Sequence, residues 1–152
     1  MEIQLLIIII LMIACSAFFS ASETALTGAN RIRLKSMAEN GSKGAKMALK
    51  LLDRYDKVIT TILIGNNIVN ITASSLGTIL ATAIVGPDNA ALVSTVVLTL
   101  VILAFGEVMP KSLAKDHSEG LTVATSGIIT FLTFIFTPLS ALFILLKKLA
   151  NK

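Results

Sequence analysis

The groups most able to do chemistry in this sequence are oxygen atoms placed inside otherwise apolar stretches. Glu107 lies in the stretch AFGEVMPKS, directly after Gly106 and three residues before Pro110. In an unbroken α-helix the amide of residue 110 would donate to the carbonyl of residue 106, but proline has no amide hydrogen. The sequence therefore predicts a free backbone carbonyl beside a carboxylate, an arrangement that can coordinate a cation where it lines a cavity.

Two other apolar stretches carry neutral oxygen groups at helical spacing. Ser16 and Ser20 are four residues apart in CSAFFSASET, and Asn66 and Asn70 are four apart in LIGNNIVNIT. Each pair would share one face of a helix. A serine can bond back to its own helix, whereas a buried amide without a partner costs on the order of a few kcal/mol. The asparagines therefore indicate either cation ligands or hydrogen bonds that join helices.

This set of oxygen atoms suits a hard cation such as Mg²⁺, Ca²⁺ or Na⁺. Zinc and copper would be expected to recruit histidine or cysteine, and the chain has one of each. His117 lies in the polar stretch KDHSEG, outside the apolar stretches, which disfavours a serine nucleophile with a histidine base. We therefore expect cation binding and no enzyme activity. For Glu107, an ion pair with Lys111 near the end of a membrane span is the alternative.

The composition indicates that these residues are positioned by membrane helices. Of the 152 residues, 55% are hydrophobic and 14% are charged, and the mean hydropathy is +0.86. Apolar runs of the length needed to cross a bilayer cover about residues 3–22, 58–85, 91–109 and 128–146. The runs are continuous rather than alternating, which favours helices over a β-barrel. The first run lacks a basic start and a cleavage context, so it is expected to remain as a span.

The positions of the basic residues predict the topology. All 13 Lys and Arg fall within residues 31–57, 111–115 and 147–152. The positive-inside rule places these segments in the cytoplasm and the N-terminus outside, with the C-terminus cytoplasmic. Four crossings would separate the second segment from the third, so the fourth run is expected to re-enter or lie in the interface, bending near Thr137 and Pro138. A proline-kinked fourth span is the alternative.

The predicted fold class is therefore an all-α membrane protein, a homodimer with three transmembrane helices per protomer and cytoplasmic juxtamembrane or re-entrant helices. One domain covers residues 1–152. The expected spans are about residues 3–27, 58–85 and 91–112, and the expected juxtamembrane helices are about residues 31–56 and 120–150. The dimer is expected because three spans enclose little by themselves, and small residues let another helix approach the second span closely. These small residues are Ala73, Gly77 and Ala81.

The polar segment before the second span predicts two short helices. Asn40 and Gly41 should end the first helix, and Ser42 should cap the second. The second helix has an apolar face between basic residues and is expected to lie along the cytoplasmic lipid surface. This face comprises Ala45, Ala48, Leu49 and Leu52. The basic charge is thus assigned to the lipid bilayer, and no nucleic-acid partner is expected.

Three of the stretches carry a resemblance to a known family. FFSASETAL, GNNIVNI and GEVMPKS occur in this order, with a basic helical segment between the first two. In these residues and across nearly its whole length, the chain closely resembles the transmembrane domain shared by the CNNM and CorC magnesium transporters. The resemblance implies a dimer in the plasma membrane that transports Mg²⁺, as efflux coupled to Na⁺.

The resemblance also implies the residues of the ion site. By motif, the site maps onto Ser16, Ser20, Asn66, Asn70, Gly106 and Glu107. Ser22 lies off the face of the first two serines and is a second choice. Family members usually continue into cytoplasmic nucleotide-binding CBS modules, whereas this sequence ends at Lys152, so it is expected to be the membrane part of a longer protein.

Two other functions are compatible with the residues. A proton-coupled exporter of small organic cations could also depend on one membrane carboxylate. Such a site would favour aromatic walls, but the chain has no Trp and one Tyr, Tyr55, which lies in the polar segment. The second alternative is a dimeric membrane anchor that transports nothing and whose polar residues only join helices.

Overall fold

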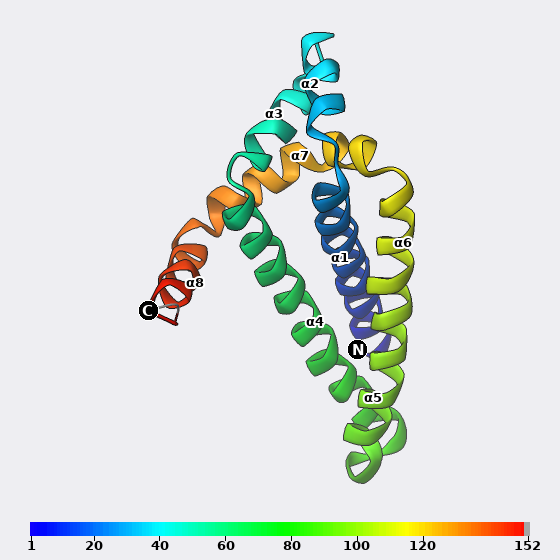
Figure 1. The fold of residues 1–152 in the computed structure, drawn as a ribbon. Helices are drawn as coiled ribbons and strands as arrows, with labels where there is room; N and C mark the ends of the chain where they lie inside the picture. Colours follow the sequence, from blue (N-terminus) through cyan, green and yellow to red (C-terminus); the bar gives the residue numbers. More distant parts are fainter. Residues whose placement is uncertain (151–152) are drawn as a thin grey trace. The chain divides into compact units, whose positions relative to one another are not determined.

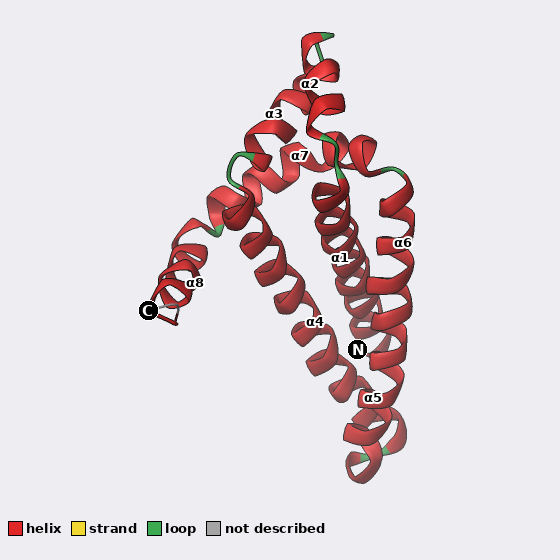
Figure 2. Cartoon of the chain, in the orientation of Figure 1, coloured by secondary structure: helices red, strands yellow, loops and turns green. Residues whose placement is uncertain are grey.

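The computed structural model describes residues 1–150, and within this range the chain forms helices joined by short turns, with no strand (Figure 2). The predicted all-α fold class is therefore confirmed for the described residues. The helices, in chain order, are α1 (Glu2–Gly28), α2 (Arg31–Glu39), α3 (Lys43–Leu52), α4 (Tyr55–Val85), α5 (Pro87–Val101), the π-helix η1 (Ile102–Val108), α6 (Met109–Asp116), α7 (Ser118–Ile135) and α8 (Thr137–Ala150).

The chain divides into two compact units. The first unit contains Met1–Ser20 and Gly65–Ser112, and the second contains Ala21–Ile64 and the described residues from Leu113 onward. The first unit therefore holds the start of α1, most of α4, and α5 with η1. The six residues predicted for the ion site all belong to this first unit.

The core of the first unit joins α1, α4 and α5. Ile9, Ala73, Leu98 and Ile102 are buried together in one hydrophobic cluster. A Cβ atom on Gly77 would collide with the side chain of Leu98, so glycine is needed for α5 to pack this closely on α4. The prediction that small residues let a second helix approach α4 is confirmed, and that helix belongs to the same chain.

A single residue connects α4 to α5 in the first unit. Gly86 has a φ of +82°, a conformation that residues with a side chain rarely adopt. Pro87 follows at the first position of α5, where its missing amide hydrogen costs nothing. The chain therefore reverses sharply, and α5 begins directly at the end of α4 (Figure 1).

The second unit is built on the packing of α3 against α7. Ser42 caps α3 by accepting from the amide of Ala45 at 3.2 Å, which confirms the predicted cap. A Cβ atom on Gly44 would lie 2.9 Å from the carbonyl oxygen of Val123, so the two helices approach closely there. Ala45 and Ala48, two of the four residues predicted for the apolar face of α3, are buried, whereas the expected position of α3 along the lipid surface stays a prediction. The buried residues of α3 are Ala45, Ala48 and Leu51.

The expected break near Pro138 is present. Helix α7 ends at Ile135, the amide of Phe136 donates to the carbonyl of Leu132 at 2.8 Å, and α8 begins at Thr137. Pro138 is the second residue of α8, where its missing amide hydrogen is tolerated. The proline therefore starts a new helix instead of kinking one long helix.

Four helical segments of the described chain are long and apolar enough to cross a membrane, one more than the three expected spans. They are α1, α4, the continuous stretch Pro87–Asp116, and α7. The fourth segment begins at Ser118, well before the apolar run at residues 128–146. Length and composition thus make the chain a multi-pass membrane protein in contact with the lipid bilayer.

Candidate metal site

Ser16 brings three segments of the first unit together. Its side chain is fully buried, and its hydroxyl donates to Oδ1 of Asn66 at 2.9 Å. The same hydroxyl lies 3.5 Å from the carbonyl oxygen of Gly106. We call these residues the Ser16 cluster (Ser16, Asn66 and Gly106). Three of the six predicted site residues, one each from α1, α4 and η1, are therefore in direct contact.

The close approach within the Ser16 cluster depends on glycine. A Cβ atom on Gly106 would lie 3.0 Å from Oγ of Ser16 and 3.3 Å from its Cβ, so an alanine there would require Ser16 to shift by a few tenths of an ångström. One turn away, a Cβ atom on Gly65 would collide with the ring of Phe19. Both glycines let α1 lie directly against backbone of the neighbouring segments.

Two further predicted residues contribute buried oxygen atoms without hydrogen bonds. Oγ of Ser20 and Oδ1 of Asn70 are buried, and neither has a hydrogen-bond partner among the described residues. An unpaired buried polar atom is costly, and in native structures it usually has a functional reason. A cation beside either oxygen atom would satisfy it, because each oxygen has lone pairs to donate.

The antiparallel arrangement of α1 and α4 sets the positions of these unpaired oxygens. Ser16 contacts Asn66, while Ile9, earlier on α1, packs with Ala73, later on α4. Ser20 and Asn70 therefore lie on opposite sides of the Ser16 cluster, each about one helical turn away. Side chains on a helix tilt toward its N-terminus, so both side chains lean toward the cluster.

Glu107 follows the cluster directly in the chain. Its side chain is half-buried within a segment long enough to span the membrane. The alternative of an ion pair between Glu107 and Lys111 stays a prediction. A carboxylate within a span costs about 2.5–3.5 kcal/mol on insertion scales, and this cost falls near the interface.

The backbone around Glu107 differs from the sequence-based expectation. Ile102–Val108 is a π-helix, and the amide of Met109 donates to the carbonyl of Ala104, five residues earlier. On the same spacing, Pro110 would face the carbonyl of Phe105 rather than that of Gly106. The predicted route by which proline frees the Gly106 carbonyl is therefore corrected, because the π turn shifts the register by one residue. Single π turns occur often at functional sites.

The distances within the Ser16 cluster can be compared with the ligand spacing of a magnesium ion. Mg²⁺ binds oxygen atoms at about 2.0–2.1 Å in an octahedron, so neighbouring ligands lie about 3 Å apart. The 2.9 Å and 3.5 Å distances from Oγ of Ser16 are close to this spacing. Within the described residues, no group of three or more His, Cys, Asp or Glu side chains could hold a metal. The oxygen atoms of the Ser16 cluster are therefore all neutral, and Glu107 is the carboxylate next to the cluster in the chain.

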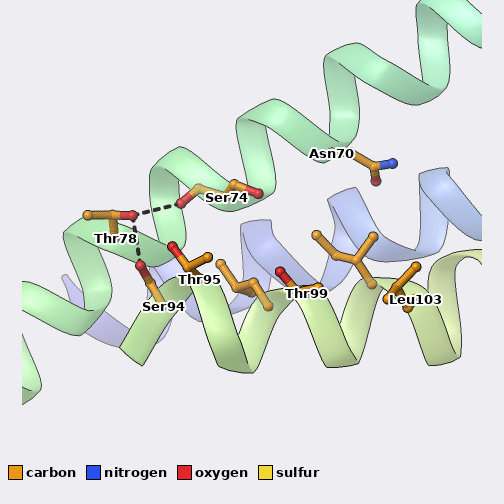
Figure 3. Close-up of a pocket in the computed structure, with 9 residues that line it drawn as sticks. Asn70, Ser74, Thr78, Ser94, Thr95, Thr99 and Leu103 are labelled. Carbon is orange, nitrogen blue, oxygen red and sulfur yellow. Dashed lines mark hydrogen bonds between the residues drawn. The ribbon is translucent and has the colours of Figure 1, made fainter. Parts of the chain in front are cut away.

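A polar groove beside the Ser16 cluster was missed by the sequence analysis. It has a volume of about 430 Å³ and lies between α4 and α5 (Figure 3). We call it the hydroxyl groove, after the polar residues that line it. These are Asn70, Ser74, Thr78, Ser94, Thr95 and Thr99. The spacing by four of the three residues from α4 is the signal that could have revealed it.

Ser22, the second choice from the sequence, belongs to the second unit. Its side chain is buried, and its Oγ has no hydrogen-bond partner among the described residues. It therefore resembles Ser20 in burial and in its unpaired oxygen, although it lies outside the unit that holds the Ser16 cluster.

Comparison with known proteins gives a family match over residues 6–152, to the cyclin M (CNNM) transmembrane N-terminal domain. A UPF0053 protein of Haemophilus influenzae is 44% identical over 135 residues, covering 89% of this chain and 32% of the relative. The UPF0053 inner membrane protein YfjD of Escherichia coli is 44% identical over 124 residues, covering 82% of this chain and 29% of the relative.

A more distant relative carries a name that states an activity. It is a polyamine export protein of Haemophilus influenzae, 26% identical over 143 residues, with coverage of 86% of this chain and 33% of the relative. The chain thus spans about a third of the length of these curated relatives.

Proposed function

This chain belongs to the family of CNNM transmembrane domains, and on that premise we propose that it is the ion-transporting membrane part of a Mg²⁺ transporter. The observation that carries the proposal is the Ser16 cluster. Its buried oxygen atoms have nearly the spacing of neighbouring ligands in a magnesium octahedron, and it is flanked by the unpaired oxygens of Ser20 and Asn70.

Each residue of the site would supply a different kind of oxygen. Glu107 would provide the negative charge, Gly106 a backbone carbonyl, Asn66 and Asn70 amide oxygens, and the serines hydroxyl oxygens. Mg²⁺ loses its water reluctantly, so several protein oxygens must replace that water together. A site with one carboxylate and several neutral ligands offsets only part of the free-energy cost of removing water from Mg²⁺. Binding is therefore weak enough for the ion to leave.

The hydrogen bond between Ser16 and Asn66 does not prevent both from binding an ion. A hydroxyl oxygen keeps two lone pairs while it donates its proton, and an amide oxygen has two lone pairs. Asn66 can accept from Ser16 with one lone pair and bind the cation with the other. The hydrogen bond would then hold both oxygens in place before the ion arrives, which reduces the ordering cost of binding.

The remaining parts of the proposal concern the assembly. We expect a homodimer in the plasma membrane, with the N-terminus outside and the C-terminus in the cytoplasm. Three segments, α1, α4 and Pro87–Asp116, would cross, while α7 and α8 would re-enter or lie in the interface. The transporter would export Mg²⁺ in exchange for Na⁺, with cytoplasmic CBS modules in the full-length protein, and it would catalyse no chemical reaction. The positive charge of the segments that contain Lys and Arg supports this orientation, because such segments usually lie in the cytoplasm.

Titration of the purified chain with Mg²⁺ tests the proposal. A ligand that binds only the folded state stabilises it, by about 2.7 kcal/mol at a hundred times its dissociation constant. We therefore expect a saturable rise in the melting temperature with Mg²⁺ and a matching heat in isothermal titration, with Na⁺ present and absent. Absence of any saturable effect would reject the site and favour a membrane anchor that transports nothing.

Export of an organic cation is the second candidate, because a relative is named a polyamine export protein. A polyamine carries several separated positive charges and would be favoured by several carboxylates, whereas the Ser16 cluster adjoins one, Glu107. Spermidine in place of Mg²⁺ in the same titration distinguishes the two. Saturable stabilisation by spermidine alone would establish the organic cation as the cargo.

A further inference from the structure

The hydroxyl groove joins the candidate metal site to the α4–α5 end of the first unit. Asn70, Ser74 and Thr78 follow one another at intervals of four residues along α4, so their side chains form a row. Thr95 and Thr99 face this row from α5, as Figure 3 shows. The row from residue 70 to residue 78 is about 12 Å long, at 1.5 Å per residue.

The two ends of the groove differ. At one end lies Asn70, whose buried Oδ1 has no partner among the described residues and which is also a candidate metal ligand. At the other end, the hydroxyls of Thr78 and Ser94 are 2.9 Å apart and hydrogen-bonded across the two helices. Beyond this bond the chain reaches the turn at Gly86. The groove thus leads from the unpaired amide oxygen of Asn70 to the hydrogen-bonded hydroxyls of Thr78 and Ser94.

Packing alone does not account for these side chains. The close contact between α4 and α5 is made by Gly77 against Leu98, and Leu98 and Ile102 also line the groove. Ser74 and Thr99 are exposed. Two apolar helices would pack through the same glycine without any hydroxyl in this row.

We infer that the hydroxyl groove is the passage through which a hydrated divalent cation moves between the metal site and the α4–α5 turn. The inference rests on the proposed function and adds the route to it. Waters bound to the cation are hydrogen-bond donors, and serine and threonine oxygens accept such bonds. Six waters occupy about 180 Å³ at about 30 Å³ each, which the 430 Å³ groove can hold.

The chemistry of the groove suits passage rather than storage. The polar residues that line it are neutral hydroxyls and one amide, so the ion keeps its water and binds weakly. Conduction needs sites that are weak enough for the ion to leave. The pair formed by Thr78 and Ser94 would be the narrowest point, and separating its two hydroxyls would open the end near the turn.

Cysteine accessibility tests the route directly. Cys15 is exposed and is first replaced, as Cys15→Ala, so that an introduced thiol reacts alone. Ser74→Cys and Thr99→Cys should then react with a water-soluble cationic methanethiosulfonate reagent at least about tenfold faster than a lipid-facing control, because thiolates form in water and not in lipid. Ile71→Cys is the matched control, since Ile71 is 66% exposed on α4 outside the groove. Equal rates at all three positions would overturn the inference.

Transport by variants separates the route from the site. In liposomes, Ser74→Ala and Thr99→Val should lower the Mg²⁺ flux at least about threefold and leave the Mg²⁺ dissociation constant unchanged, because they remove passage groups rather than ligands. Thr72→Val is the control, since Thr72 donates to the carbonyl of Ile68 on α4 and does not line the groove.

The outcomes for the site and for the route are distinguishable. Normal flux in both groove variants, with normal Mg²⁺ binding, would overturn the route and leave the metal site standing. An unsubstituted chain that binds no Mg²⁺ would reject the proposed function and the route with it. A flux that falls equally in Thr72→Val would also overturn the route, because the loss would then follow from any threonine on α4.

Discussion

The buried hydroxyls of α7 and those near the Ser16 cluster are the same kinds of residue used in two ways. On α7, Thr122 donates to the carbonyl of Ser118 at 2.7 Å, and Ser126 donates to that of Val123 at 2.8 Å. These bonds stay within one helix, so the polar atoms of these buried residues are already satisfied. Such hydroxyls contribute to packing and are poor ligands.

Near the cluster the hydroxyls are used differently. Ser16 donates across to α4, and the oxygen of Ser20 has no partner within the described residues. A polar atom left unpaired in a buried place lowers stability unless water or an ion satisfies it. Burial alone therefore does not separate these two groups of hydroxyls, whereas the direction and pairing of their hydrogen bonds do. Ser22 is the unpaired hydroxyl in the second unit that this criterion also selects.

The largest expected effect comes from the charge at the site. Glu107→Gln should weaken Mg²⁺ binding about a hundredfold, because it removes the negative charge from an otherwise neutral oxygen set of nearly the same shape. Glu119→Gln is the control from the second unit, where Glu119 lies 3.6 Å from Arg33 in an ion pair. Isothermal titration measures both. Equal affinities in the two variants would show that the carboxylate of Glu107 faces away from the ion.

The next effect tests the close approach at glycine. Gly106→Ala should weaken Mg²⁺ binding about tenfold, because the new Cβ would lie 3.0 Å from Oγ of Ser16 and force this proposed ligand to shift. Gly120→Ala is the matched control on α7, since a Cβ there meets nothing within 4 Å. In this control the melting temperature should stay the same or rise, because alanine favours a helix over glycine. Unchanged Mg²⁺ affinity in Gly106→Ala would argue against the Ser16 cluster as the site.

A smaller effect separates the two kinds of buried hydroxyl. Ser20→Ala should weaken Mg²⁺ binding roughly threefold without lowering the melting temperature of the metal-free protein, because the lost oxygen has no partner among the described residues. Ser126→Ala should do the reverse. It should lower the free energy of unfolding by about 1 kcal/mol, since a hydrogen bond is lost, and leave Mg²⁺ affinity unchanged. Differential scanning calorimetry with and without Mg²⁺ measures both effects. The same response in both variants would show that the two hydroxyls have the same role.

The features predicted correctly from the sequence are those with local causes. The cap at Ser42 and the break near Pro138 follow from side-chain and backbone chemistry within a few residues. The close contact at Gly77 was also expected, because a row of small residues has few other uses in an apolar helix. The identity of the partner helix was not expected, since the sequence shows which face is small but not what packs on it.

The features that were missed depend on contacts between distant segments. The contact of α3 with α7 was not predicted, because periodicity does not show which helix covers an apolar face. The hydroxyl groove arises where Ser74 and Thr99 face each other, and their 25-residue separation hides this in a linear reading. The sequence also does not show the hydrogen-bond partners of the serines, so Ser20 and Ser126 look alike until the structure is known.

The smallest expected effect concerns Pro110, for which the sequence and the structure make opposite predictions. In an α-helical register, Pro110→Ala would return a donor to the Gly106 carbonyl and weaken ion binding. In the π register, where the amide of Met109 donates to Ala104, a new amide at residue 110 would face Phe105 instead. Mg²⁺ affinity should therefore change by less than about twofold, because no ligand gains a competing donor. Isothermal titration of the variant decides between the registers, and a drop as large as that of Gly106→Ala would show that the ion-binding state uses the α-helical one.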